Sequence, residues 1–253
     1  MKKFYLLTLL IGLCFSAKSE DLILWQDYSL TYLWGEHFRV DPEEQQTITF
    51  EHVSSLSFGD TFTFVDFTRY SHSDEPEGLY GETVLRFSYN KIANENFTAG
   101  PITDVLFATS LEFGKGPVET FLFGPSVDLN VPGFDFVQVS LFRREGLNDD
   151  DKNISEGWQL TPAWSMTIPV GKSEIVFDGF FDWVFATDDK RYEENFHFNP
   201  QLKYNLGKLL FTPETRFYVG IEYDYWSNKY GIDDSDDFKT DQNVVSLLAK
   251  YHF

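Results

Sequence analysis

The chain has 253 residues, and its 40 acidic and 20 basic side chains give a net charge of −20 at neutral pH. This length suits one sizeable domain, and so acidic a chain excludes a nucleic-acid-binding protein, which needs a basic surface. The single cysteine is Cys14, so residues 20–253 offer neither a disulfide scaffold nor a thiol nucleophile.

The amino-terminus has the pattern of an export signal. Lys2 and Lys3 precede the apolar run 4–13, and Ala17 and Ser19 place small residues at the two cleavage positions. We therefore predict a signal peptide over residues 1–19 and a single exported domain over residues 20–253. No later run approaches the roughly 20 apolar residues that a membrane-spanning helix needs.

Twelve later segments alternate between apolar and polar residues with a period of two, which predicts β-strands. We place them at residues 24–34, 46–57, 61–71, 79–90, 98–113, 118–130, 134–145, 156–168, 174–187, 195–206, 214–227 and 241–253. The last segment puts Val245, Leu247, Tyr251 and Phe253 on one face and more polar residues on the other. An amphipathic strand with an aromatic terminus is typical of outer-membrane β-barrels.

The connections between these segments alternate in length. The short turns include residues 58–60, 130–133 and 169–172, whereas longer connections carry acidic runs at residues 41–44, 74–77, 149–151, 188–189 and 233–237. Short periplasmic turns and longer external loops are the rule in transmembrane barrels. We therefore predict an all-β fold, a twelve-stranded antiparallel transmembrane barrel with both termini periplasmic. A secreted β-sandwich is the alternative, but aromatic residues near the strand ends favour a membrane protein.

Several stretches carry a resemblance to a known family. They are Phe62-Thr63-Phe64-Val65-Asp66-Phe67, Leu85-Arg86-Phe87-Ser88, Gly100-Pro101-Ile102-Thr103-Asp104, Phe123-Gly124-Pro125-Ser126-Val127-Asp128, Gly157-Trp158-Gln159-Leu160 and Gly179-Phe180-Phe181-Asp182-Trp183. In order and spacing they resemble the nucleoside-specific channel-forming outer-membrane proteins, the family of Tsx and OmpK. The resemblance implies a monomeric twelve-stranded barrel in the bacterial outer membrane, with a narrow pore for nucleosides. The external loops here are shorter and more acidic than the family pattern.

If the apolar rows face lipid, the opposite rows line the pore, and the groups on them determine selectivity. A nucleoside offers a flat ring and sugar hydroxyls, so its site needs aromatic faces and carboxylate or amide acceptors. The pore-lining residues that we select as substrate-binding candidates are Phe62, Phe64, Asp66, Arg86, Asp104, Asp128, Asp182, Glu222 and Asp224. The same inward rows include Glu51, Glu82 and His197.

Two other interpretations of these residues stay open. The rings can simply fill the interior of a small barrel, or a β-bulge can turn them to the other face. The acids can be partners for Arg86, Arg144 and Arg216 in a rigid interior network.

The leading functional hypothesis is an outer-membrane channel for passive, substrate-selective diffusion of nucleosides or similar small solutes. The alternative is a barrel without transport that acts as a surface receptor, including a phage receptor, or as a structural protein. We expect no enzyme, metal or cofactor, because the sequence has no G-x-S-x-G or H-E-x-x-H motif and its histidines lack metal-ligand spacing. The expected surroundings are outer-membrane lipid and lipopolysaccharide, whose phosphates divalent ions could link to the acidic loops.

Overall fold

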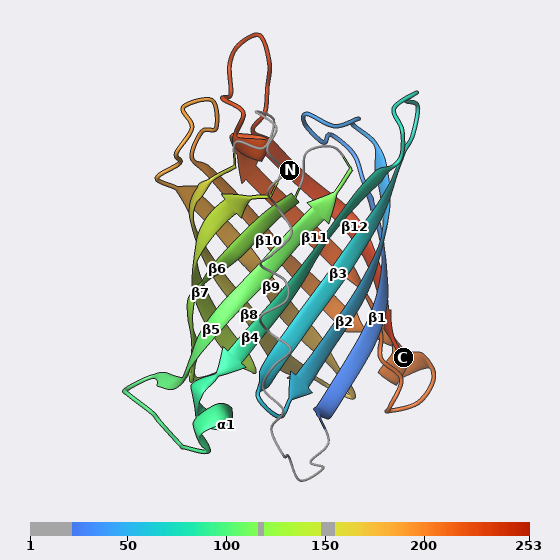
Figure 1. Cartoon of the computed structure of the whole chain (residues 1–253). Coiled ribbons are helices and arrows are strands. Elements are labelled where there is room, and N and C mark those ends of the chain that lie inside the picture. The colour runs from blue at the N-terminus through green and yellow to red at the C-terminus, as the bar shows by residue number, and fades with distance from the viewer. Residues whose placement is uncertain (1–21, 116–118, 148–154) are drawn as a thin grey trace.

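The computed structural model describes residues 22–115, 119–147 and 155–253, and these residues form a closed antiparallel barrel of twelve strands (Figure 1). Their bounds are β1 Ile23–Gly35, β2 Gln45–Leu56, β3 Gly59–Tyr70, β4 Gly78–Ser88, β5 Ile102–Gly114, β6 Glu119–Leu129, β7 Phe136–Gly146, β8 Gly157–Val170, β9 Ser173–Phe185, β10 Asn195–Asn205, β11 Phe217–Ser227 and β12 Gln242–His252. The same described residues include three short helices: α1 Tyr89–Ala93, α2 Leu206–Leu210 and the 3-10 turn η1 Lys229–Gly231. The predicted fold class and strand number are confirmed.

Each strand pairs with its neighbours in the chain, and the barrel closes where β1 pairs with β12. At this seam Ser29–Trp34 lie antiparallel to Leu247–His252. Closure leaves no unpaired edge, which is the condition for placing a sheet in lipid.

The two faces of the wall differ as the alternation predicts. On β12 the side chain of Val245 is 56% exposed, whereas that of its neighbour Val244 is 2% exposed. Leu247, Tyr251 and Phe253 are exposed in the same row as Val245. The exposed row of this strand faces lipid, and the buried row faces the lumen.

The two ends of the barrel carry different connections. At the terminal rim, where Leu22 and Phe253 lie, the connections are residues 57–58, 89–101, 130–135, 171–172 and 206–216; α1 lies in the second and α2 in the last (Figure 1). At the opposite end, the loop rim, the fully described connections are residues 36–44, 71–77, 186–194 and 228–241. The acidic runs at 41–44, 74–77, 188–189 and 233–237 all lie at the loop rim.

The bounds around α1 and α2 correct the sequence-based ranges. The fourth and tenth strands end at Ser88 and Asn205, and the fifth and eleventh begin at Ile102 and Phe217. Both connections are therefore longer than predicted, because a helical turn follows each strand. The predicted signal peptide and the acidic residues Asp149–Asp151 lie outside the described residues.

Within the described part of the chain, no helix is long and apolar enough to cross a membrane.

Candidate functional site

The lumen-facing side of β5–β7 contains a buried apolar cluster. Ala108 on β5, Leu122 on β6 and Phe142 on β7 form one buried cluster, in which the first two side chains have no exposed surface. Close packing of this kind leaves no room for a solute. This part of the interior, which we call the closed wall, therefore has a structural role.

Two buried arginines border the closed wall. Arg86 on β4 donates from Nε to Asp60 Oδ1 at 2.7 Å, from Nη2 to Asp60 Oδ2 at 2.8 Å and from Nη1 to Asp128 Oδ1 at 2.7 Å. Arg144 on β7 binds both oxygens of Glu112 on β5, at 3.0 and 2.7 Å. Bidentate pairs of this geometry are the strong form of the arginine–carboxylate interaction. The sequence-predicted candidates Arg86 and Asp128 thus belong to an ion network.

Further pairs occupy the lumen beside the seam. Lys203 on β10 lies 2.6 Å from both carboxylate oxygens of Asp178, and Lys250 on β12 pairs with Glu51 on β2. Both lysines are buried. A buried lysine needs such a partner, so Asp178 and Glu51 also have a structural function.

Four lumen carboxylates differ, because the structure gives them hydroxyl or amide donors and, among the described residues, no ion pair. Asp66 on β3 accepts from Thr49 at 2.5 Å, and Glu82 on β4 accepts from Ser110 at 2.6 Å. On the other side of the barrel, Asp182 of β9 accepts from Thr161 at 2.5 Å and from Gln159 at 2.9 Å. Glu222 of β11 accepts from Gln201 at 2.8 Å. These acids keep acceptor capacity for a solute.

Aromatic rings lie beside these acids on both sides. Phe62, Phe64 and Tyr80 share the lumen face of Asp66 and Glu82; the centroids of Phe62 and Phe64 are 5.9 Å apart, and those of Phe64 and Tyr80 are 5.7 Å apart. Phe62 is 38% exposed although it points inward. An inward ring with open surface is available for stacking.

The facing strands carry a second aromatic group. His197 on β10 stacks on Trp226 of β11 at 4.0 Å and meets the edge of Phe180 on β9 at 5.4 Å. Its Nε2 lies 3.2 Å from Asp224 Oδ1. Asp224 therefore has a histidine partner, unlike the four acids above.

The two sets face one another across the lumen. The strands β3 and β9 lie six positions apart in the twelve-stranded ring, and the strand registers point Asp66, Glu82, Asp182 and Glu222 into the same lumen. All four of these side chains are partly exposed, whereas the closed wall is buried. We call the two sets together the acid–aromatic pathway. The first set consists of Phe62, Phe64, Asp66, Tyr80 and Glu82, and the second of Phe180, Asp182, His197, Glu222, Asp224 and Trp226.

The structure therefore divides the nine candidates into groups. Phe62, Phe64, Asp66, Asp182, Glu222 and Asp224 lie in the acid–aromatic pathway, whereas Arg86 and Asp128 lie in the ion network. Asp104 lies near the terminal rim, where it accepts from Asn90 N at 3.1 Å and from the hydroxyl of Ser88.

Sequence reasoning did not select Glu82, Tyr80 and His197 as site residues. Glu82 and His197 were assigned to the inward rows, and Tyr80 alternates with Glu82 on the same strand. Alternation was therefore the available signal, but it could not separate unpaired groups from paired ones.

At the loop rim, Lys229 ties two connections together. Its Nζ donates to Asp41 Oδ2 at 2.8 Å, to Arg39 O at 2.9 Å and to Gln242 Oε1 at 2.9 Å. The rings of Tyr230, Trp226 and Phe38 lie 4.9–5.9 Å from the same nitrogen. These contacts fix the connections 36–44 and 228–241 against each other at one side of the mouth.

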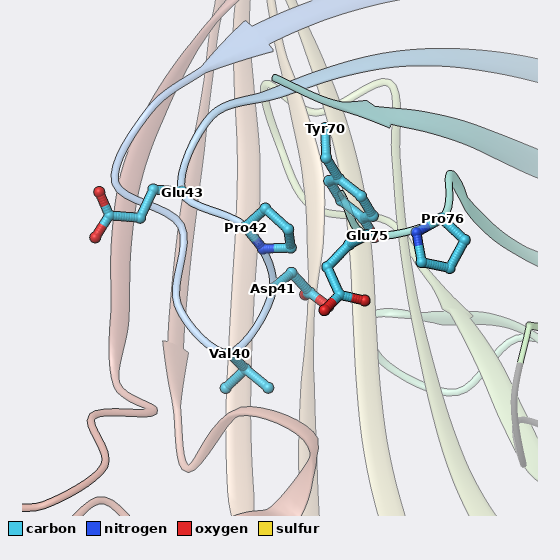
Figure 2. A pocket seen from close by; sticks show the side chains of 7 residues that line it. All are labelled: Val40, Asp41, Pro42, Glu43, Tyr70, Glu75 and Pro76. Carbon is cyan, nitrogen blue, oxygen red and sulfur yellow. The ribbon is translucent and has the colours of Figure 1, made fainter. Parts of the chain in front are cut away.

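An open cavity of about 470 Å³ lies beside this contact (Figure 2). Its lining comes from the connections 36–44 and 71–77 and from the end of β3: Val40, Asp41, Pro42, Glu43, Tyr70, Glu75 and Pro76. Figure 2 shows the carboxylates of Asp41 and Glu75 near each other below the Tyr70 ring. The cavity is at the entrance and is lined by none of the acid–aromatic residues, so we regard it as a vestibule.

Within the described residues, no group of three or more His, Cys, Asp or Glu side chains could hold a metal ion.

Comparison with protein families gives a match over residues 23–253 to the model of the nucleoside-specific channel-forming protein, Tsx. The chain belongs to this family. Its Tsx-type barrel is therefore an outer-membrane channel, and the predicted location and family are confirmed.

Two solved structures align with this Tsx-family barrel. The KdgM porin aligns with a TM-score of 0.50 and 13% identity, over 89% of this chain and 99% of that one. Pseudomonas aeruginosa OccK11 aligns with a TM-score of 0.41 and 9% identity, over 90% of this chain and 95% of that one. At this identity the KdgM likeness shows the fold alone. No curated protein sequence matches the chain.

Proposed function

We propose that this barrel is a passive channel for nucleosides and that the acid–aromatic pathway recognises them during passage. The single observation that supports this most is the position, on two facing walls, of carboxylates without an ion pair among the described residues beside partly exposed rings. A nucleoside combines a flat base with sugar hydroxyl donors, and the pathway offers a partner for each part.

The carboxylates are suited to the sugar. Asp66, Glu82 and Glu222 each accept one or two hydrogen bonds from the protein, and a carboxylate has about four acceptor sites. A ribose hydroxyl that donates to such a group gains roughly 1.5–3 kcal/mol. The acids also disfavour phosphorylated solutes, because like charges repel.

The rings are suited to the base. The partly exposed faces of Phe62 and Phe64, and the His197–Trp226 stack opposite, can contact a purine or pyrimidine from either side. Each stacking contact contributes roughly 0.5–1.5 kcal/mol beyond area burial. Contacts of this size allow entry and release, which a channel requires.

The test is flux through liposomes that contain the purified barrel. Asp66→Asn keeps the side-chain shape and removes the charge, and Phe62→Leu removes the ring. For each variant we expect adenosine flux to fall several-fold, with a smaller change in glucose flux and in small-ion conductance.

Asp236→Asn is the matched control, because Asp236 is a fully exposed acid on the loop rim; it should leave all three rates unchanged. A proportional fall of adenosine flux and ion conductance in Asp66→Asn would mean that Asp66 shapes the pore without recognising the solute, and would overturn the proposal.

A further inference from the structure

The two longer connections at the terminal rim are built alike. Each begins with a five-residue helix directly after a strand, α1 after β4 and α2 after β10. The residue before each helix caps it: Ser88 accepts from Lys91 N at 3.0 Å, and Asn205 accepts from Lys208 N at 3.1 Å. The third helical residue is thus a lysine in both.

Both lysines reach back to the barrel. Lys91 Nζ donates to Gly59 O at 2.7 Å, to Ser55 Oγ at 2.9 Å and to Leu56 O at 3.0 Å. Lys208 Nζ donates to Glu174 Oε2 at 2.5 Å. Each lysine therefore fixes one side of its helix against the rim.

The opposite side of each helix is apolar. Successive residues are about 100° apart around a helix, so the first, fourth and fifth residues lie away from the lysine. On α1 these include Tyr89 and Ile92, and Phe97 packs edge-on against Tyr89. On α2 they include Leu209 and Leu210, which Phe211 follows.

These side chains are exposed, with values that reach 61% at Ile92 and 68% at Phe211. We name Tyr89, Ile92 and Phe97 the α1 surface, and Leu209, Leu210 and Phe211 the α2 surface. Both continue the lipid-facing wall. Tyr89 comes two residues after Phe87 of the outward row of β4, and α2 begins two residues after Tyr204 of the outward row of β10. The surfaces therefore begin where the lipid-covered barrel ends.

The two surfaces lie on opposite sides of the barrel. The β4–β5 pair and the β10–β11 pair are six strands apart in the ring. In Figure 1 the labelled α1 lies at the lower left, and the orange β10–β11 connection lies at the lower right beside the carboxy-terminus.

We propose that the α1 and α2 surfaces are interfacial anchors that insert into the phospholipid leaflet adjoining the terminal rim. Apolar side chains at the headgroup boundary bind a membrane through the area that they bury. Two anchors on opposite sides hold the barrel at a fixed depth and resist tilt. A protein partner fits less well, because a stable interface uses about 20–30 residues a side, far more than either surface provides.

The test places one environment-sensitive fluorophore at a time on single cysteines in the full chain, with Cys14→Ser as background. Ile92→Cys and Leu210→Cys probe the surfaces. Lys172→Cys is the matched control, because Lys172 is exposed in the tight β8–β9 turn at the same rim. Heat-modifiable electrophoretic mobility confirms that each labelled barrel is folded.

In bilayers we expect blue-shifted emission, quenching by brominated phospholipids and loss of iodide quenching at residues 92 and 210, but not at residue 172. Iodide quenching as strong at 92 and 210 as at 172 would overturn the proposal. Protection that grows with protein concentration and occurs without quenching by bromolipid would indicate contact between copies of the chain, and would also overturn it.

Discussion

Charged side chains inside this barrel have different kinds of partner on its two sides. Around the closed wall, Arg86 and Arg144 are buried, and each holds carboxylates at 2.7–3.0 Å. Along the acid–aromatic pathway, the donors to Asp66 and Glu222 among the described residues are a hydroxyl and an amide. The same residue type thus supports the wall in one place and stays available in the other. Pairing, more than inward position, distinguishes a structural acid from a functional one.

The largest effect should come from Arg144→Met, which leaves Glu112 buried without its cation. Removal of one partner of a buried ion pair costs about 3–5 kcal/mol, so the free energy of unfolding should fall by that amount. Urea titration of the barrel refolded in lipid vesicles measures it. Arg144→Met combined with Glu112→Gln should recover part of the loss, and a double variant no more stable than the single one would refute the pairing argument.

The apolar part of the closed wall should be almost as sensitive. Leu122→Ala removes a side chain with no exposed surface, and such cavities cost about 2–5 kcal/mol. Phe62→Leu on the open side should cost less than about 1.5 kcal/mol, because a ring with open surface leaves no enclosed void. The same urea titration compares the two variants. Equal losses of unfolding free energy would contradict the distinction between the two sides of the barrel.

Asp66→Asn should change stability by no more than about 0.5 kcal/mol. No ion pair of the described residues is broken, and the asparagine amide keeps an oxygen that can accept from Thr49. A loss of several kcal/mol in unfolding experiments would show that Asp66 is structural after all.

The smallest effect concerns the pair of Asp189 and Arg191 on the loop rim. This exposed pair serves as a reference for the ion pairs of the interior. Side-chain and backbone hydrogen bonds from Arg191 lower the pKa of Asp189 to about 2. A lowered pKa means that the contribution to stability is present above the ordinary value near 3.8 and is lost as the pH falls through about 2. Arg191→Gln should return the carboxyl titration, followed by NMR, toward the ordinary value. No change would mean that the pair does not form in solution.

Alternation predicted the inward direction of the pathway residues well. Phe62, Phe64 and Asp66 occupy every second position of β3, and the register of that strand keeps all three on the lumen face. A period of two fixes direction because successive side chains point to opposite faces.

Alternation could not predict how far along the barrel axis a side chain lies, or which group it contacts. Asp104 and Asp182 both point inward, but one lies near the terminal rim and the other in the pathway. Arg86 meets Asp60 across one strand pair and reaches Asp128 two strands further. Those contacts depend on the relative offset of several strands, which one sequence does not specify.

The helices α1 and α2 were missed because five residues carry too little periodicity. The capping residues Ser88 and Asn205 were the available signal, since serine and asparagine commonly precede helices.

The pairing of β1 with β12 has a consequence for biosynthesis. One edge of Ser29–Trp34 pairs with β2, but the other edge pairs with Leu247–His252, so the second edge of β1 must wait for nearly all of the chain to be made. A ribosome that stops early would release a sheet with two open edges, whose unpaired amides a bilayer strongly disfavours. The geometry of this one seam therefore makes the membrane-compatible form depend on the final strand, because a chain shortened before β12 cannot close the barrel.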